Sequence, residues 1–310
     1  MRLLQIENFG TLKLVAIFGE GLIGSEICQQ ILKRFDASDC FFTFSWNKVE
    51  LQNIQLVQIG EYISKTFGDY DDIELSIVWS AGSISFDAKE SEFCSVLSSY
   101  INVLFFFQKL SRDVRFKVSF HLLSSIGGLY EGAGYINSST SKFPLRAYGR
   151  YKITEEYLLQ ECVDFNSKII YRLSSVYGLP KEGQRKGLIP TLVYNNLYNK
   201  STSIYGNLST IRDYVYNRDV ANFIISQFVN GLDINETFYL ASFKPTTIYE
   251  VNSILERITK KKSKIIFSSG ITNGQNISLN PNLRPTGFRV TPFLSTFSEI
   301  YRYCIKARMQ

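Results

Sequence analysis

The fold is decided near the amino terminus by the stretch LVAIFGEGLIG, residues 14–24. Residues 14–18 are apolar like a buried strand, and residues 25–34 follow with Ile27 and Ile31 at helical spacing. Between them lies Gly-x-Gly-x-x-Gly, in which the glycines allow a tight turn, the close approach of a pyrophosphate and close packing of the helix on the strand. An ordinary glycine-rich turn is the alternative, but the flanking strand and helix favour dinucleotide binding. The predicted cofactor-binding residues of this turn are Gly19, Gly21, Leu22, Ile23 and Gly24.

Strand-like and helix-like segments alternate along the chain up to about residue 178. The strand-like runs are 14–18, 41–45, 75–79, 118–123 and 168–173, and the helix-like segments are 25–34, 92–110 and 147–162. Such repeated strand-then-helix order predicts an α/β fold with a Rossmann-like doubly wound parallel sheet. Shorter mixed elements follow, as expected of a smaller mixed C-terminal substrate-binding domain. We therefore expect a dinucleotide-binding domain at 1–178 and a substrate domain at 179–310, with strands that can cross between them.

The composition excludes several kinds of site. The 310 residues include five cysteines without a Cys-x-x-Cys pair and one histidine, His121, so no metal site and no disulfide framework is expected. His121 lies inside a predicted strand and is expected to be structural. Most hydrolase mechanisms would have to use it and are disfavoured.

Charge and hydropathy bear on whether nucleic acid or a membrane is a partner. The chain has 34 basic and 28 acidic side chains, a net charge of +6, and its densest basic run, 260–264, is expected to be a solvated helix end. We therefore expect no nucleic-acid partner. No apolar stretch reaches bilayer length and residues 1–13 do not resemble a signal peptide, so a cytoplasmic protein without a membrane partner is expected.

The end of the second predicted strand bears on the cofactor. An acid about twenty residues after the glycine turn binds the ribose 2′-hydroxyl of NAD and repels the 2′-phosphate of NADP. The strand 41–45 is followed by no acid, whereas Ser45 and Asn47 can hydrogen-bond a phosphate and Lys48 or Arg34 can balance its charge. Ser45, Asn47 and Lys48 are predicted to bind the cofactor. NADP(H) is favoured, and NAD is the alternative.

A tyrosine and a lysine four residues apart, Tyr148 and Lys152, share one face of the predicted helix 147–162. A phenol is a poor acid–base catalyst at neutral pH unless a nearby ammonium stabilises its phenolate. Lys152 can do this and also hold the cofactor. Ser124 and Ser125 end the preceding strand, and Ser125 is the candidate partner of the reacting oxygen. The predicted catalytic residues are Tyr148, Lys152 and Ser125.

With these motifs in this order, the sequence resembles the extended short-chain dehydrogenase/reductase family, in particular its nucleotide-sugar epimerase, dehydratase and reductase branch. The resemblance extends to Arg172–Gly178 and to the stretch from Ile204 to Ala221. It implies further cofactor-binding residues at Ala81, Gly82, Asn102 and Ser124. It also implies substrate-binding residues at Ser174, Ser175, Leu188, Ile189, Arg212 and Arg284, where an arginine offers a planar fork of donors to phosphate. A homodimer is a further implication.

Two positions depart from the family pattern. Phe18 stands where the family more often has glycine. Counting back from Tyr130, taken as the tyrosine of the family's Val-Tyr-Gly motif, places Ile126 where a serine or threonine usually hydrogen-bonds the reacting oxygen. Ser125 serves through a shifted turn, or catalysis depends on Tyr148 alone.

The resemblance and the missing acid together favour one reaction. We expect an NAD(P)-dependent reductase of the 4-keto group of a nucleotide-activated deoxysugar in surface polysaccharide biosynthesis, with Tyr148 as proton donor. The first alternative is a UDP-sugar 4-epimerase with tightly bound NAD. The second, of another class, is a dinucleotide-binding sensor that performs no chemistry. The expected partner is a nucleotide-diphosphate sugar.

Overall fold

The computed structural model describes residues 1–8, 11–46, 48–70, 72–82, 89–113, 115–179, 187–230, 234–268 and 276–309. By its internal contacts the chain divides into two compact units whose segments alternate along the sequence. Unit 1 comprises 1–129, 144–172 and 221–238, and unit 2 comprises 130–143, 173–220 and 239–310. The predicted division into domains 1–178 and 179–310 stays a prediction.

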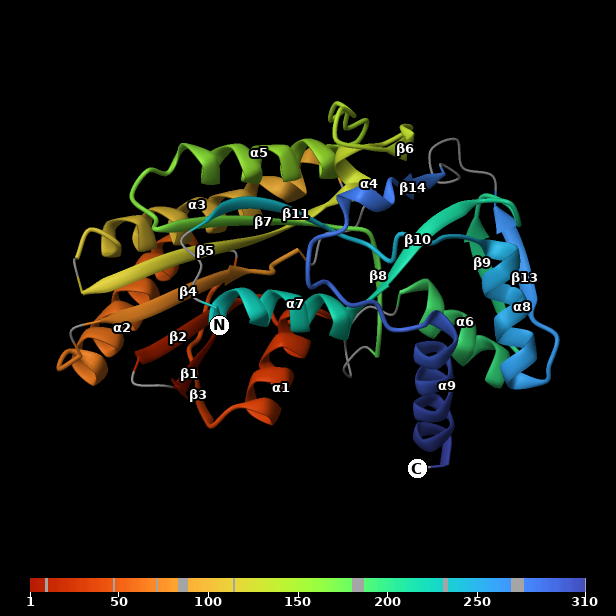
Figure 1. The fold of residues 1–310 in the computed structure, drawn as a ribbon, viewed down its shortest axis with the longest axis horizontal. Helices are drawn as coiled ribbons and strands as arrows, with labels where there is room; N and C mark the ends of the chain where they lie inside the picture. Colours follow the sequence, from red (N-terminus) through yellow and green to blue (C-terminus); the bar gives the residue numbers. More distant parts are fainter. Residues whose placement is uncertain are drawn as a thin grey trace. The chain divides into compact units, whose positions relative to one another are not determined.

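Unit 1 is built on a seven-stranded sheet of order β11-β7-β5-β4-β2-β1-β3 (Figure 1). Its strands are β1 (Arg2–Asn8), β2 (Thr11–Phe18), β3 (Ala37–Phe41), β4 (Ile73–Trp79), β5 (Phe116–Ser125), β7 (Ser167–Leu173) and β11 (Asn235–Leu240). β2, β4 and β5 are parallel neighbours. β4 is buried along nearly its whole length, as expected of a parallel strand whose two faces are covered by helices. The predicted doubly wound α/β fold is confirmed.

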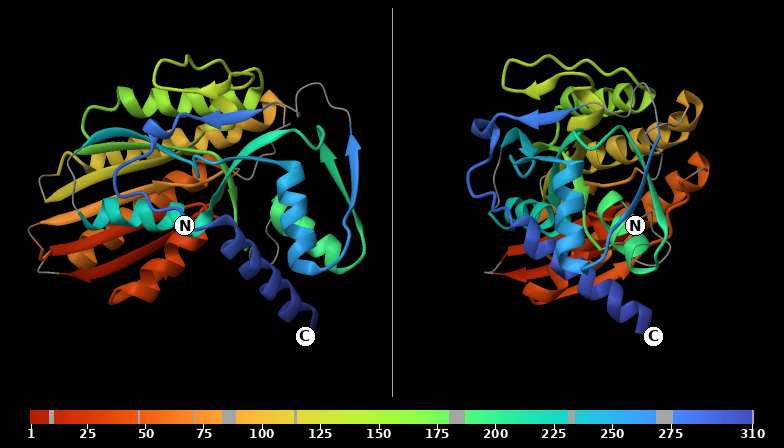
Figure 2. Two further views of the ribbon diagram at one scale, coloured as in Figure 1. Left: turned by 45° about the vertical axis from the view of Figure 1, so that its right-hand side comes forward. Right: turned by 90° about the vertical axis from the view of Figure 1, so that its right-hand side faces the viewer.

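Helices cover the two faces of this sheet (Figure 2). They are α1 (Gly24–Arg34), α2 (Val49–Phe67), α3 (Glu90–Leu110), α4 (Ile126–Leu129), α5 (Ala147–Glu161) and α7 (Asn217–Val229), the last of which begins in unit 2. The apolar sides of α2, α3 and α5 form one core with the sheet, in which Leu14, Ile77 and Phe107 are fully buried. On the other face α7 packs on His121 and Tyr171 through Phe228 and Phe223.

The strands that follow β2 in the sheet order, β1 and β3, differ from those predicted. We expected the second strand at 41–45, but β3 occupies Ala37–Phe41, and residues 42–46 are not in a strand. β1, which the sequence pattern did not predict, lies between β2 and β3 and runs antiparallel to both. The cause is a β1–β2 hairpin that inserts the start of the chain beside the strand of the glycine turn.

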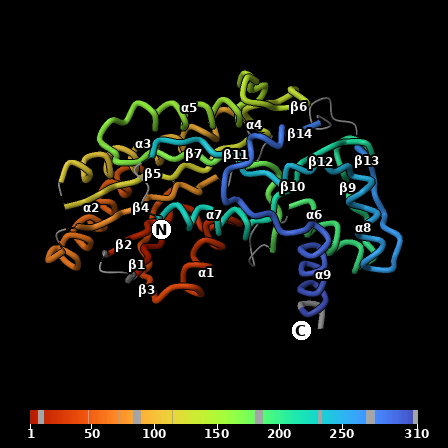
Figure 3. The backbone as a smooth tube through the Cα atoms, in the orientation of Figure 1, coloured from red at the N-terminus to blue at the C-terminus, as the bar shows by residue number. Residues whose placement is uncertain are grey.

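The described residues of unit 2 form three small sheets. Their orders are β12-β10-β8, β13-β9 and β14-β6. The strands are β6 (Gly134–Ile136), β8 (Ser175–Tyr177), β9 (Ser201–Tyr205), β10 (Ile211–Tyr216), β12 (Pro245–Thr247), β13 (Lys264–Ser268) and β14 (Ile277–Leu279). The helices are α6 (Leu188–Leu197), α8 (Ile248–Thr259), the 3-10 helix η1 (Pro281–Leu283) and α9 (Phe293–Met309). Figure 3 shows the course of α6, α8 and α9 in the backbone of this unit. Ile189, Leu255 and Phe297 on these helices belong to one buried hydrophobic core.

In the described part of the chain, one helix, α3, has the length and apolar composition of a membrane span, with a mean hydropathy of 1.3. Its residues Tyr100, Val103, Leu104 and Phe107 are buried in the core of unit 1. A core helix meets the same criteria, so α3 is weak evidence for a membrane segment.

Candidate active site

The glycine turn between β2 and α1 has the packing that a dinucleotide turn needs. Gly19 has a φ of +96°, and a Cβ there would lie 2.6 Å from the backbone nitrogen of Ala81. A side chain at Gly24 would overlap the carbonyl oxygen of Gly19, so this glycine allows the helix to pack against the turn. Gly21 has no atom within 4 Å of a built Cβ. The turn is therefore closed on its protein side and open at Gly21, as binding of a pyrophosphate requires.

The amino terminus of α1 completes this turn. No side-chain hydrogen bond caps the helix at its N-cap residue, Ile23. Uncapped N–H groups and the helix dipole favour an anion at this position. On the other side of the turn, the hydroxyl of Ser80 donates to the carbonyl of Phe18 at 3.1 Å. The predicted residues Ala81 and Gly82 follow Ser80, so the structure brings them to the turn.

Tyr148 lies against the short helix α4. A Cβ at Gly128 would lie 2.9 Å from two ring carbons of Tyr148, so this glycine leaves the space that the phenol ring occupies. The N–H of Gly128 donates to Oγ of Ser125 at 3.1 Å. Gly128 therefore lies against two of the three predicted catalytic residues, Tyr148 and Ser125, and the hydroxyl of Ser125 can still donate its own proton. Ile126 is fully buried at the start of α4 and carries no polar group to this place.

Lys152 is buried and held by two oxygen atoms. Its Nζ donates to Oε2 of Glu155 at 2.8 Å and to the carbonyl oxygen of Leu123 at 3.1 Å. Burial acts to lower the pKa of Lys152, but Glu155 beside it, with Tyr148 and Glu156, more than compensates, so the pKa is raised above its usual value. Lys152 therefore keeps its charge in a site where a lone ammonium would lose it.

Sequence reasoning missed Glu155, which is fully buried. Besides Lys152, its carboxylate accepts hydrogen bonds from Nε1 of Trp79 at 2.8 Å and from the hydroxyl of Tyr151. Burial raises the pKa of Tyr151 well above its usual value, and Glu155 raises it further, so this phenol stays protonated and donates. No motif marks Glu155, although an acid that falls on the apolar face of a helix three residues after a lysine is a signal that could have found it.

A second buried ion pair holds the end of β5 to α5 and β7. Arg172 donates from Nε and Nη2 to the two oxygens of Glu156 at 3.0 and 2.8 Å, and the hydroxyl of Ser124 donates to the same carboxylate at 2.7 Å. A bidentate pair of this kind fixes geometry as well as charge. The hydroxyl of Ser124 is thus used inside the protein, and its contact with a cofactor stays a prediction.

The residues predicted to bind the cofactor after the second strand lie next to α2. Gln52 donates to the carbonyl of Ser45 at 2.8 Å and accepts from the amide of Asn102 at 2.9 Å. The structure therefore connects Ser45 and Asn102 through Gln52. Lys48 is exposed, and Asn47 lies outside the described residues.

Four of the predicted substrate-binding residues line one pocket in unit 2. The pocket is formed by Ser175, Val176, Tyr177, Leu188, Ile189, Arg212 and Tyr214. The hydroxyl of the neighbouring Ser174 donates to the carbonyl of Asp213 at 2.7 Å. Arg284 does not line this pocket. Its guanidinium donates to the carbonyl of Phe288 at 3.1 and 2.8 Å.

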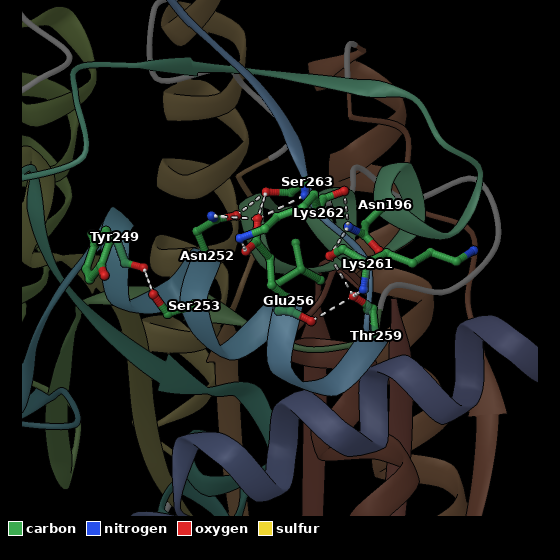
Figure 4. Close-up of polar contacts among 10 residues, drawn as sticks. Asn196, Tyr249, Asn252, Ser253, Glu256, Thr259, Lys261, Lys262 and Ser263 are labelled. Atoms are coloured by element: carbon green, nitrogen blue, oxygen red, sulfur yellow. Dashed lines mark hydrogen bonds and ion pairs between the residues drawn. The ribbon is translucent and has the colours of Figure 1, made fainter.

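The basic run at the end of α8 makes protein contacts of its own (Figure 4). Nζ of Lys262 donates to Glu256 at 2.9 Å, and Nδ2 of Asn196 donates to the carbonyls of Lys261 and Lys262 at 3.4 and 3.3 Å. The side chain of Lys262 is 93% exposed. This is the solvated helix end that the sequence predicts.

Part of the chain matches known nucleotide-sugar enzymes in sequence. Residues 101–237 match the sequence model of the NAD dependent epimerase/dehydratase family. A Bacillus subtilis (strain 168) protein named uncharacterized UDP-glucose epimerase YtcB is 29% identical over 154 residues, which are 48% of this chain and 46% of that protein. The matched part is thus about half of the length of this relative.

Solved structures share the fold over most of the chain. A Thermus thermophilus UDP-glucose 4-epimerase in complex with NAD has a TM-score of 0.75 at 16% identity, covering 94% of this chain and 99% of that one. A Bacillus cereus UDP-glucuronic acid 4-epimerase in complex with UDP-glucuronic acid and NAD has a TM-score of 0.71 at 18% identity, covering 95% and 99%.

The chain therefore has the fold of NAD-binding nucleotide-sugar epimerases, and its residues 101–237 match the NAD dependent epimerase/dehydratase family. The fold predicted from the sequence is confirmed, and the family match agrees with the resemblance that the motifs indicate.

Proposed function

We propose that the protein is an NAD(P)-dependent enzyme that inverts the configuration at C4 of a UDP-sugar. The observation that carries this proposal is the placement of Tyr148 against α4, with the charged Lys152 one helical turn further along α5. The names of the relatives support 4-epimerisation better than the 4-keto reduction that the sequence favours, because both neighbours named above are 4-epimerases. The named relative from Bacillus subtilis supports the same interpretation.

The residues of unit 1 have separate tasks in this reaction. The glycine turn from Gly19 to Gly24 and the start of α1 would hold the pyrophosphate of the dinucleotide. When bound, its nicotinamide supplies the acceptor and donor of a hydride. Tyr148 as a phenolate takes the proton of the sugar hydroxyl and, as the resulting phenol, later returns it. The charge of Lys152 stabilises the phenolate that exists before the first of these steps and after the second. Ser125 donates to the reacting oxygen.

The experiment offers UDP-glucose and UDP-glucuronic acid to purified protein without added cofactor and separates the products by chromatography. We expect conversion of one of them to its C4 epimer, since a 4-epimerase regenerates its cofactor in each turnover. Conversion of neither substrate by protein that holds dinucleotide would contradict the proposal and would support a non-catalytic sensor.

A second candidate is the 4-keto reductase. It is favoured by an observation at the carboxyl end of β2, where the neighbouring strand β1 places the guanidinium of Arg2, paired with Glu20, beside the glycine turn. A reductase releases its oxidised cofactor after each turnover and suits exchangeable NADPH. It predicts stoichiometric consumption of NADPH with a 4-keto sugar nucleotide and no turnover without added cofactor. A homodimer and a cytoplasmic location stay predictions under both interpretations.

A further inference from the structure

Arg2 lies at the carboxyl end of β2, where the sequence pattern predicts the end of the second strand, near Ser45. In a doubly wound sheet, the strand beside the one that ends in the glycine turn contributes the residue that meets the 2′ position of the adenosine ribose. Here that neighbouring strand is β1. Because β1 is antiparallel, its first residues lie at the carboxyl end of β2, and Arg2 pairs with Ile17. Arg2 therefore lies opposite Ile17, which precedes Gly19 by two residues.

The guanidinium of Arg2 binds the glycine turn directly. Its Nη2 lies 3.0 Å from Oε2 of Glu20, the second residue of the turn, and its Nη1 lies 3.2 Å from Oδ2 of Asp39 on β3. The guanidinium carbon stands 4.0 Å from the ring centroid of Phe41. A guanidinium fixed by an aromatic ring and two carboxylates keeps its place without a ligand.

The arrangement leaves part of this guanidinium unused. Within the described ranges, Nε of Arg2 is buried and has no hydrogen-bond partner. The side chain of Arg2 is 14% exposed, and those of Glu20 and Asp39 are each 26% exposed. Glu20 lies on the turn, so its carboxylate is the partner that another anion at the turn would replace.

We infer that Arg2 binds the 2′-phosphate of NADP(H), and that Glu20 is the carboxylate that this phosphate displaces from the guanidinium. The inference rests on the dinucleotide-binding part of the proposed function and holds for either sugar reaction. Under this inference a preference for NADP would come from Arg2 and not from Ser45, Asn47 and Lys48. Asp39 would remain paired with Nη1 and keep the guanidinium oriented.

The test measures dissociation constants of NADPH and NADH by titration calorimetry, with a purification tag at the carboxyl end so that Arg2 is undisturbed. A charged hydrogen bond is worth about 1.5–3 kcal/mol, or roughly tenfold or more in affinity. Arg2→Gln should therefore weaken NADPH binding at least about tenfold and change NADH binding less than about twofold. Glu20→Gln should tighten NADPH binding.

A matched control is Arg112→Gln, because Arg112 is an exposed arginine whose Nη2 pairs with Asp164 at 3.0 Å. It should change neither constant. If Arg2→Gln fails to fold, wild-type protein still decides the point by competition between 2′,5′-ADP and 5′-AMP, which differ only in the 2′-phosphate. Tighter binding of 2′,5′-ADP is the expected result, and equal binding overturns the inference.

Two other outcomes are informative. Equal loss of NADH and NADPH affinity in Arg2→Gln would mean that Arg2 positions Glu20 for a ribose hydroxyl, and would overturn the inference while the proposed function stands. A wild-type protein that binds neither dinucleotide would overturn the proposed function itself, and the inference with it.

Discussion

The ammonium of Lys152 and the carboxylate of Glu155 form an ion pair inside α5, 2.8 Å apart, with side chains 5% and 0% exposed. Two groups this deeply buried depend on one another, because either charge alone would lack water and a counter-ion. The pair also joins α5 to β4, since Trp79 donates to the same carboxylate. Glu155 is therefore a positioning residue for Lys152.

Replacing Glu155 by Gln should destabilise the protein by about 3 kcal/mol, because the buried ammonium loses its counter-charge. Urea denaturation at pH 7 measures this change. The matched control is Glu90→Gln, which breaks the pair with Arg150 on the surface, where the two side chains are 74% and 52% exposed. Exposed pairs contribute about 0–1 kcal/mol. An equal effect of the two substitutions would contradict the role given to Glu155.

Replacing Tyr148 by Phe should lower kcat by at least about 100-fold, because the proton carrier is lost. Calorimetric titration should show unchanged dinucleotide affinity, since only a hydroxyl is removed. Tyr157→Phe is the control, as Tyr157 lies on the same helix and is 59% exposed. A Phe variant with wild-type kcat would exclude Tyr148 as the acid–base residue.

Replacing Gly128 by Ala should displace the ring of Tyr148, from which the new Cβ would lie only 2.9 Å away. Overpacking of this kind costs about 1–3 kcal/mol of stability, and kcat should fall with it. Gly187→Ala is the comparison, because the nearest atom to its new Cβ would be 4.0 Å away. Thermal melts and steady-state rates of the two variants test the contact.

His121 should make the protein sensitive to acid. Burial lowers its pKa to about 3, and its ring nitrogens hydrogen-bond Ser119 at 3.0 Å and Tyr171 at 2.9 Å. The unfolded state, with a histidine pKa near ~6.5, binds the proton first, so stability falls as the pH drops from there towards 3. Between about pH 6.5 and about pH 4.5 this loss amounts to about 2 kcal/mol.

The measurement compares urea unfolding of the wild type and of His121→Gln at pH 7 and pH 4.5. The free energy of unfolding of the variant should decrease less between the two pH values. An identical decrease in both proteins would show that other groups, such as carboxylates, account for the whole acid sensitivity.

Local patterns predicted the sheet, which is confirmed, and they placed the glycine turn between a strand and a helix and Tyr148 and Lys152 on one helix, as in the structure. These features are predictable because apolar periodicity and a spacing of four residues on a helix are set within one element. The position of Ile126 also followed from counting along the chain, and its full burial agrees with the absence of a hydroxyl there.

The parts that were missed depend on contacts between elements. Glu155 acquires its role from Trp79 on β4, which is 76 residues away in sequence. The role proposed for Arg2 was not predicted, because the sequence pattern placed the strand beside β2 later in the chain than the glycine turn. In the structure that neighbour is β1, which precedes the turn in the sequence. Strand order of this kind is a property of the whole sheet and is not encoded in the motif.

The most direct test of the proposed reaction is a proton NMR time course of UDP-glucose and of UDP-glucuronic acid with purified protein and no added cofactor. We expect the signals of one C4 epimer to grow until an equilibrium mixture is reached, and Tyr148→Phe to leave the spectrum unchanged over the same time. Unchanged spectra with wild-type protein that carries bound dinucleotide, or equal rates in both proteins, would contradict the proposed reaction.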